Sequence, residues 1–424
     1  MGDTMNGCLF RTLTLNLLLV TSLVAAAPLF AADPIIHNNY GVDLLERGEV
    51  DKAIEQLEKA YSLFATDQRL KHNLAAAYST RGQQLLDRKA YDDAAGEFEK
   101  AAGLYPNEPR FALLRGVSLV LGKRYDAGRY ELERSRSLGG DTAEALYFLG
   151  RIHYENGETE QALPLWEKAA TLATADPFLA KVLDRMRREQ AVEERMVRGH
   201  SSRFVVSYDT GTTRTGIALD ILDVLEHHYN SVGADLAYYP EARVPLILYT
   251  KQEYREVTHS PTWSGGLYDG KIRLPVGGLA EITPRLRATL RHEYTHAVIR
   301  DMTKDNCPTW LNEGIAEFQG RQEYNPPLTE LPRAVREGRL LPLRSLEQGL
   351  STLSDREVAL AYEQSYALIN FMVTSYGWHR VQAILLALGS GATVDAAINS
   401  GLADYGLNYD GMVKEWREQL RNAL

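Results

Sequence analysis

Cysteine, net positive charge and long apolar runs are all scarce in this chain of 424 residues. The two cysteines are Cys8 and Cys307, and Cys8 lies in an N-terminal segment that we expect to be removed, so a disulfide framework is excluded. Lys and Arg total 47 against 56 Asp and Glu, and the net charge of −9 repels polyanions, so no nucleic-acid partner is expected. A hydrophobic content of 45% at this length allows two or three domains, each with its own core.

The N-terminus has the pattern of a secretory signal peptide over residues 1–32. Arg11 precedes an apolar run from Leu13 to Ala27, and small residues follow as far as Ala32. The run is shorter than the ~20 residues that span a bilayer comfortably, and an uncleaved membrane anchor is the alternative. With cleavage near Ala32, the mature protein is expected to be periplasmic or secreted and to have no membrane span, because no later apolar run is long enough.

A period of 34 residues runs through the first half of the chain. One series of glycines and one series of large side chains keep this spacing: Gly82, Gly116 and Gly150, and Phe98, Leu132 and Trp166. A further unit beginning near Gly41 keeps the same internal offsets about seven residues out of register. This pattern resembles the tetratricopeptide repeat, a helix-turn-helix unit with small residues where its two helices cross. The resemblance implies an α-helical solenoid of about four repeats over residues 33–177.

Repeats of this kind stack into a superhelix whose concave groove binds peptides or partner proteins. We therefore expect a protein partner in the groove; the alternative is that the repeats act only as a scaffold for the neighbouring domain. Residues 178–199 carry spaced apolar side chains among many charges, which predicts a capping or linker helix that ends at Gly199.

The pattern changes from residue 200 onward to a mixture of short strands and helices. Residues 203–208 and 244–249 are short, β-branched and apolar, and they bracket a helical pattern over 214–232. Thr283 and Pro284 then supply a cap and a first-turn proline for a helix that carries His292, Glu293 and His296. These three residues form an H-E-x-x-H motif. Because the two histidines lie one turn apart on one helix face, both can bind one Zn²⁺, and Glu293 can act as general base.

A second predicted helix follows Pro308 and supplies two carboxylates, Glu313 and Glu317, one turn apart. A catalytic zinc site has three protein ligands and an open position, so Glu313 completes a site with two histidines and one glutamate. The stretch Trp310-Leu-Asn-Glu-Gly-Ile-Ala316 resembles the W-L-N-E-G-[FI]-A segment of gluzincin metallopeptidases, the group of thermolysin and aminopeptidase N. The resemblance implies that Glu313 is the third ligand and that Glu317 orients a zinc histidine, although Glu317 can equally be an ordinary surface residue.

The segment 361–372 is predicted to form a helix with two tyrosines on one face. Tyr362-Glu-Gln-Ser365 is similar to the Y-E-x-G stretch of the aminopeptidase N branch, except that Ser365 replaces glycine. The resemblance implies that Tyr362 donates a hydrogen bond to the developing oxyanion. Tyr366 is the other candidate, with core packing as its alternative role.

The loop before the zinc helix departs from the aminopeptidase pattern. Enzymes of that branch bind the free N-terminus of a substrate with a glutamate in a G-x-M-E-N loop. This chain has no glutamate in the corresponding loop, Gly265-Gly266-Leu267-Tyr268-Asp269. Endopeptidase action is therefore favoured, unless Asp269 takes the place of that glutamate. The strand predicted at residues 271–274 is expected to form the sheet edge and to pair with a substrate backbone. The candidate substrate-binding residues are Gly265, Gly266, Tyr268, Asp269 and Tyr366.

The expected fold is thus an α-helical tetratricopeptide-repeat solenoid followed by an α+β zincin-like metallopeptidase domain, residues 200–424, with a helical C-terminal part. The expected function is a zinc-dependent peptidase that acts on peptide bonds of exported or envelope proteins and carries one Zn²⁺ per chain. The alternative is a non-catalytic binding protein of the cell envelope, in which the repeats bind the partner and the peptidase-like domain is a scaffold.

Overall fold

A computed structural model describes residues 33–174, 176–259 and 265–423, so the predicted signal peptide lies outside the described residues. The described chain forms two compact units. The first, here called the repeat unit, comprises residues 33–152 and 165–179. The second, here called the C-terminal unit, comprises residues 153–164 and 180–423. Among the described residues, no helix combines the length and apolarity needed to cross a membrane.

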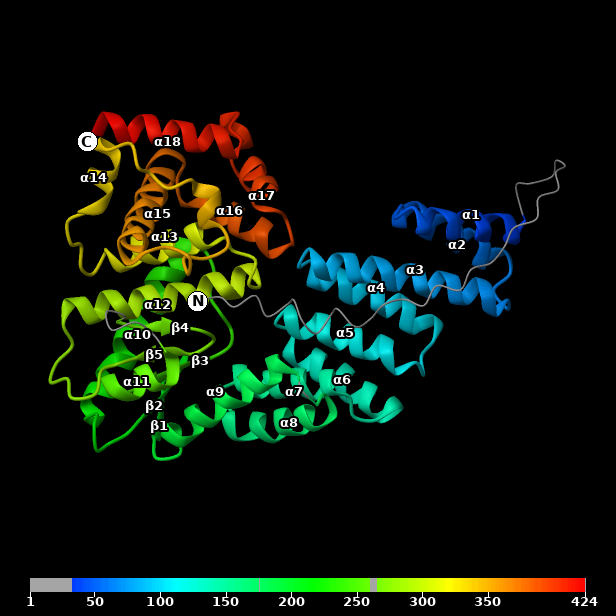
Figure 1. Ribbon diagram of the computed structural model, residues 1–424, viewed down its shortest axis with the longest axis horizontal. Coiled ribbons are helices and arrows are strands. Elements are labelled where there is room, and N and C mark those ends of the chain that lie inside the picture. Colours follow the sequence, from blue (N-terminus) through cyan, green and yellow to red (C-terminus); the bar gives the residue numbers. More distant parts are fainter. Residues whose placement is uncertain (1–32, 175, 260–264, 424) are drawn as a thin grey trace. The chain divides into compact units, whose positions relative to one another are not determined.

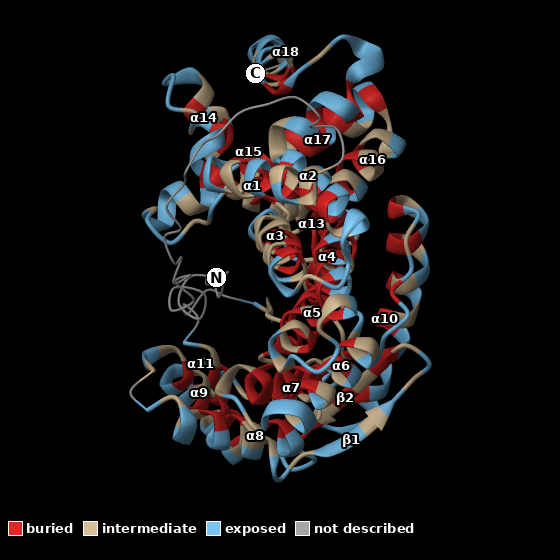
Figure 2. Cartoon of the chain, turned by 90° about the vertical axis from the view of Figure 1, so that its right-hand side faces the viewer, coloured by how far each residue is buried: buried red, intermediate tan, exposed pale blue. Residues whose placement is uncertain are grey.

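The N-terminal half consists of antiparallel helix pairs (Figure 1). The helices are α1 (Pro34–Glu46), α2 (Val50–Leu63), α3 (Gln68–Asp87), α4 (Tyr91–Leu104), α5 (Pro109–Leu121), α6 (Tyr125–Gly139), α7 (Ala143–Glu155), α8 (Thr159–Leu172) and α9 (Pro177–Glu193). Figure 2, coloured by burial, shows buried residues along the helices of the array and exposed residues at many of the connecting turns. This arrangement confirms the predicted tetratricopeptide-like solenoid.

The periodic glycines lie where the two helices of a repeat cross. A Cβ atom added at Gly82 would stand 2.7 Å from the ring of Phe98, and one added at Gly116 would stand 2.8 Å from Leu132 Cγ. The third glycine, Gly150, is equally close to Trp166, at 2.5 Å. Each large side chain therefore fills the space that the missing glycine side chain leaves, which is why both series keep the period of 34 residues.

The helix after the last repeat is shorter than predicted. It ends at Glu193, and residues 197–200 form the strand β1 (Val197–His200), paired antiparallel with β2 (Phe204–Tyr208). The capping-helix prediction thus extends too far, because the charged stretch before Gly199 becomes a sheet edge instead of a further helical turn.

The C-terminal unit contains one five-stranded sheet in the order β1-β2-β3-β5-β4. The other strands are β3 (Val244–Leu248), β4 (Leu267–Tyr268) and β5 (Ile272–Leu274). The central strands β2, β3 and β5 are parallel, and β4 pairs antiparallel with β5. The prediction that residues 271–274 form the sheet edge is wrong: β5 lies between β3 and β4, and β4 is the edge. Gly270, at φ +110°, makes the tight turn that returns the chain from β4 to β5.

The two faces of β5 have different surroundings. Ile272 and Leu274 pack in the main core with α10 (Thr215–Leu236) and α12 (Pro284–Thr303). Lys271 and Arg273 alternate with them, so they point to the other face, and both are buried. On that face a smaller core joins α9, β3 and α11 (Lys251–Thr258). The sheet is therefore covered on both sides.

The rest of the C-terminal unit is helical (Figure 1). The elements are α13 (Thr309–Gly320), α14 (Glu330–Arg336), η1 (Leu343–Leu346), α15 (Asp355–Tyr376), α16 (Trp378–Gly389), α17 (Val394–Gly401), η2 (Ala403–Tyr405) and α18 (Tyr409–Ala423). The main core continues from the sheet through α12 into α13, α15 and α16. The predicted fold class, a helical solenoid followed by an α+β part and a helical C-terminal part, is confirmed.

Candidate metal centre

The helix α12 begins as its sequence predicts and carries both histidines on one face. The hydroxyl of Thr283 caps it by accepting from the backbone N–H of Leu286 at 3.1 Å, and Pro284 occupies the first turn. One turn apart, His292 and His296 bring their Nε2 atoms to within 3.1 Å of each other. The imidazoles therefore converge on one point beside the helix.

Glu313 reaches that point from α13. Its Oε2 atom lies 3.6 Å from His292 Nε2 and 3.4 Å from His296 Nε2. The ligand atoms of all three residues lie within 4.8 Å of one another. The position of α13 depends on a close approach to α15, because a Cβ atom at Gly314 would meet the backbone oxygen of Ser365 at 2.6 Å. Ser365 is buried at this crossing, and it stands where the aminopeptidase pattern has glycine.

The donor set fits a zinc ion. Two imidazoles and one carboxylate are typical zinc ligands, and three protein ligands leave a position open for chemistry. Glu313 Oε2 is buried and has no hydrogen-bond partner among the described residues, which is costly unless a cation is bound. Burial alone would raise the pKa of Glu313, but His296 and His292 hold it well below its usual value. Burial alone would lower the pKa of His292, but Glu313, Glu317 and Glu293 raise it to about 9.

Each imidazole is also held from its other nitrogen. His292 Nδ1 lies 3.4 Å from Glu317 Oε1, and His296 Nδ1 lies 3.0 Å from Asn312 Oδ1. Such contacts fix the tautomer and the ring orientation of a metal-binding histidine. Glu317 occupies the place proposed for it from the sequence. No role for Asn312 was predicted from the sequence, although its position directly before the ligand Glu313 on the same helix could have indicated one.

Glu293 lies buried next to the ligand cluster. Burial raises the pKa of its carboxyl group, as expected for a general base that must hold a proton part of the time. The backbone of Gly266 packs directly against this carboxylate: a Cβ atom at Gly266 would stand 2.8 Å from Glu293 Oε1. The segment that leads into the edge strand β4 therefore borders the candidate base.

The two predicted tyrosines differ in their surroundings. The negative charge of Glu313 and, after it, burial and the charge of Glu293 raise the pKa of Tyr362 well above its usual value. Tyr362 is therefore close to both carboxylates and keeps its proton for donation. Tyr366 packs against Phe318, with ring centroids 6.3 Å apart, and the Arg321 guanidinium lies 4.5 Å from its ring centre. The structure brings Tyr362, and not Tyr366, to the cluster.

The remaining candidate substrate-binding residues of the loop contact different parts of the C-terminal unit. Gly265 is exposed near Thr289 on α12, and the ring of Tyr268 lies 5.8 Å from the guanidinium of Arg300. The carboxylate of Asp269 accepts from Arg273 Nε at 3.0 Å and is paired with Arg185 as well. In this loop, Gly266 is the residue that packs against Glu293.

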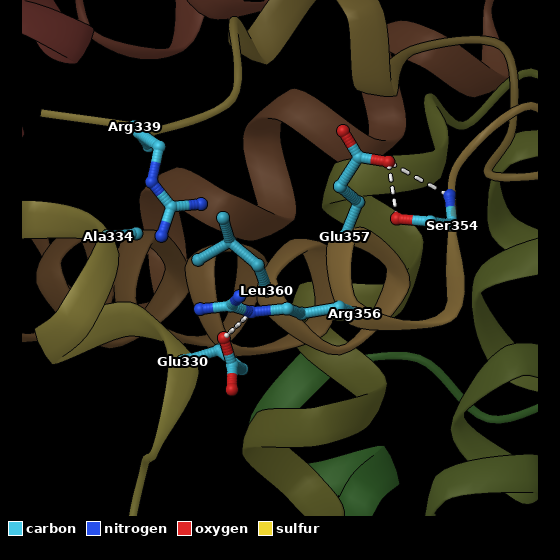
Figure 3. A pocket seen from close by; sticks show the side chains of 7 residues that line it. All are labelled: Glu330, Ala334, Arg339, Ser354, Arg356, Glu357 and Leu360. Carbon is cyan, nitrogen blue, oxygen red and sulfur yellow. Dashed lines mark hydrogen bonds and ion pairs between the residues drawn. The ribbon is translucent and has the colours of Figure 1, made fainter. Parts of the chain in front are cut away.

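A separate pocket of about 250 Å³ lies at the start of α15 (Figure 3). Arg356 there donates to Glu330 at 2.8 Å, and Ser354 donates to Glu357 at 2.6 Å. The residues lining this pocket include none of the metal-cluster residues, and its charged groups are paired. It therefore has no part in the candidate site.

Comparison with protein families places this geometry in a known context. Residues 236–422 match the Peptidase MA superfamily, and this region contains all the residues of the metal cluster. Residues 79–140 and 131–180 match the tetratricopeptide repeat. The chain thus contains a Peptidase MA superfamily domain that follows tetratricopeptide repeats.

Several solved structures resemble part of the chain. MamA AMB-1 is 22% identical, with 35% of this chain and 79% of that chain covered and a TM-score of 0.28. MamA from Desulfovibrio magneticus RS-1 is 18% identical, with 35% and 79% covered and a TM-score of 0.28. A thermophilic tetratricopeptide protein of Thermus thermophilus is 19% identical, with 36% and 98% covered and a TM-score of 0.22. No curated protein matches the chain.

Proposed function

We propose that this protein is a zinc-dependent metallopeptidase of the gluzincin type. The observation that carries the proposal is the convergence of His292, His296 and Glu313 on one point beside the buried Glu293. The match of residues 236–422 to the Peptidase MA superfamily supports it. The three ligands come from two helices that share one core, so the site is built into the fold.

The residues around the site have complementary roles in peptide hydrolysis. His292, His296 and Glu313 would hold the zinc ion, which supplies Lewis acidity to the scissile carbonyl and to water. Glu293 accepts the proton of the attacking water and passes it to the leaving amine nitrogen. Tyr362 donates its hydroxyl proton to the oxygen of the tetrahedral intermediate in a hydrogen bond. The edge strand β4 offers backbone groups to an extended peptide.

Endopeptidase action is the mode that the site favours. The only carboxylate of the 265–269 loop, on Asp269, is paired with Arg273 and Arg185. It therefore has no free charge for the amino group of a substrate terminus. We propose that the enzyme cleaves within the chains of exported or envelope proteins, and that the repeats recruit the substrate or a protein partner. Tethering a substrate beside the site would raise its effective concentration.

Metal analysis of the purified protein tests the zinc site. About one zinc per chain is expected after reconstitution at neutral pH, and His292→Ala should lose it. His227→Ala is the matched control, because His227 is exposed on α10 and is not one of the three candidate ligands. Absence of zinc from the wild type would overturn the proposal.

The alternative function is that of a repeat-based binding protein of the cell envelope with a peptidase-like scaffold. The match of residues 79–180 to the tetratricopeptide repeat is the observation that favours it. Glu293→Gln separates the two functions because it removes the base but keeps the shape of the side chain. Loss of at least about a hundredfold in peptide cleavage with zinc retained supports the enzyme. Unchanged cleavage, or an unchanged cellular phenotype, supports the scaffold.

A further inference from the structure

A cluster of buried charges lies behind the β4–β5 hairpin, on the side of the sheet away from the main core. Arg273 is fully buried and donates to Glu189 Oε1 at 2.8 Å, and Lys271 lies 3.5 Å from Glu189 Oε2. We call this set the hairpin cluster: Lys271, Arg273, Arg185, Glu189, Glu193 and Asp269, with the hydroxyl groups of Tyr154, Thr159 and Tyr249. It contains three positively charged side chains and three carboxylates, so its net charge is zero when all six are ionised.

The hydrogen-bonding capacity of the hairpin cluster is used almost completely. Arg273 donates through Nε to Asp269, through Nη1 to Tyr249 at 2.7 Å and through Nη2 to Tyr154 at 2.7 Å. Lys271 Nζ donates to Thr159 at 2.8 Å. Burial alone would raise the pKa of Glu189, but Arg273, Lys271 and Arg185 lower it to about 2. The cluster is therefore a fixed, ionised network, and its geometry tolerates little displacement of any member.

Five of the nine residues of this network precede the sheet in the sequence. Tyr154 and Thr159 lie in the segment 153–164, and Arg185, Glu189 and Glu193 lie on α9. All of them belong to the C-terminal unit, although the sequence pattern assigns residues 153–164 to the last repeat. The segment 153–164 also contacts α12, because the carboxylate of Glu155 accepts a hydrogen bond from Arg300 at 2.8 Å.

The hairpin needs such support because β4 is very short. It comprises two residues, which pair with Arg273 and Ile272 of β5. A two-residue edge strand is not stable by itself in water. Yet β4 directly follows Gly266, whose backbone packs against Glu293. A small displacement of the hairpin would therefore shift the substrate-binding edge relative to the base.

We propose that the hairpin cluster is a positioning device for the substrate: residues 153–164 and 180–193 hold β4 at the distance from Glu293 that a bound peptide backbone requires. This inference rests on the proposed peptidase function for its catalytic consequence. Its members do not touch the reacting atoms. They act through the edge strand, so their loss should weaken peptide binding more than the chemical step.

Single-atom variants of the full-length protein test this role. Tyr154→Phe removes the hydroxyl that accepts from Arg273, and Thr159→Val removes the acceptor of Lys271. Tyr376→Phe is the matched control, since it removes a hydroxyl at the last residue of α15 that donates to Glu415 at 2.7 Å and is not a member of the hairpin cluster. The probe is the oligopeptide that the zinc-loaded wild type cleaves fastest in a mixed-sequence panel. We expect KM to rise about fivefold or more in both variants, with kcat within about twofold, zinc content unchanged and the control unaffected.

Amide hydrogen exchange gives a second readout that needs no substrate. In Tyr154→Phe and Thr159→Val, exchange at residues 267–274 should become about tenfold faster, while exchange in α15 stays constant. Unchanged exchange at the hairpin overturns the inference whether or not the protein is a peptidase. Faster exchange with an unchanged KM overturns the positioning role in an active enzyme. A zinc-loaded wild type that cleaves no peptide overturns the proposed function instead, and hydrogen exchange then decides alone whether the cluster holds the edge strand.

Discussion

The side-chain oxygen of Asn312 lies 3.0 Å from His296 Nδ1, on the side of the imidazole away from Glu313. The neighbouring residue on α13 is Glu313 itself, so one turn of helix both supplies a ligand and orients another. Glu317, one turn further along α13, does the same for His292 at 3.4 Å. The short helix α13 therefore fixes the orientation of both imidazoles of α12.

Removal of these supporting contacts should weaken zinc binding without removing a ligand. In Asn312→Ala and Glu317→Gln, zinc affinity is expected to fall about 10- to 100-fold, because the imidazoles lose their fixed orientation. Competition with a chromophoric chelator measures the affinity. Gln322→Ala, at an exposed site just beyond α13, is the control and should bind zinc as the wild type does. Wild-type affinity in both variants would show that Asn312 and Glu317 do not hold the ligands.

Substitution of Gly266 should strongly reduce activity although Gly266 does not touch the reacting atoms. A Cβ atom at this position would stand 2.8 Å from Glu293 Oε1 and 2.9 Å from Glu293 Cγ, so Gly266→Ala must displace the base or the strand. We expect kcat/KM to fall about a hundredfold with zinc content unchanged.

The neighbouring glycine provides the control for this prediction. A Cβ atom at Gly265 would meet Thr289 Oγ1 at 3.6 Å, an ordinary contact, so Gly265→Ala should keep activity within about twofold. Equal activities of the two alanine variants would mean that the loop does not constrain Glu293.

The sequence was informative wherever local geometry decides the outcome. Helical periodicity alone places His292 and His296 on one face, and the period of 34 residues follows from the helix crossings at Gly82 and Gly116. The carboxylate Glu313 could be added because zinc sites need a third ligand.

Features that depend on distant segments could not be predicted in the same way. Which of β4 and β5 forms the sheet edge depends on which of them pairs with β3. Nothing in the local sequence of residues 271–274 indicates that pairing. The partners of Asp269 lie on β5 and on α9, so its carboxylate could be taken for a substrate contact as long as that packing was unknown. Asn312 likewise gains its role only from the crossing of α12 and α13.

The glycines at the repeat crossings should respond to alanine in the direction opposite to Gly96, a helical glycine beside open space. Gly116→Ala places a Cβ atom 2.8 Å from Leu132 Cγ, so it should destabilise the protein by about 1 to 3 kcal/mol through overpacking. Gly96→Ala, on α4, meets no atom within 4 Å and should stabilise by up to about 1 kcal/mol through helix propensity. Urea unfolding followed by circular dichroism measures both changes. Stabilisation by both variants would rule out the tight crossing at Gly116.

The buried His228 should make the C-terminal unit sensitive to acid. Burial lowers the pKa of His228 to about 4, although Glu323, 3.2 Å away, opposes the shift. In the unfolded chain the pKa returns to about 6.5, so between pH 6.5 and 4 the unfolded state binds a proton that the folded state does not. Stability contributed by this group is therefore present above pH 6.5 and falls as the pH drops through that window, by about 3 kcal/mol in total.

A variant without the titrating group isolates this effect. His228→Gln keeps a donor for Glu323 but cannot take up the proton, so the difference in unfolding free energy between variant and wild type should shift in favour of the variant from pH 7 to pH 4.5. Metal-free protein is used for both, so that zinc binding contributes to neither pH dependence. Parallel pH dependences of the two proteins would show that the fold leaves the pKa of His228 at its unfolded value, with Glu323 offsetting the cost of its burial.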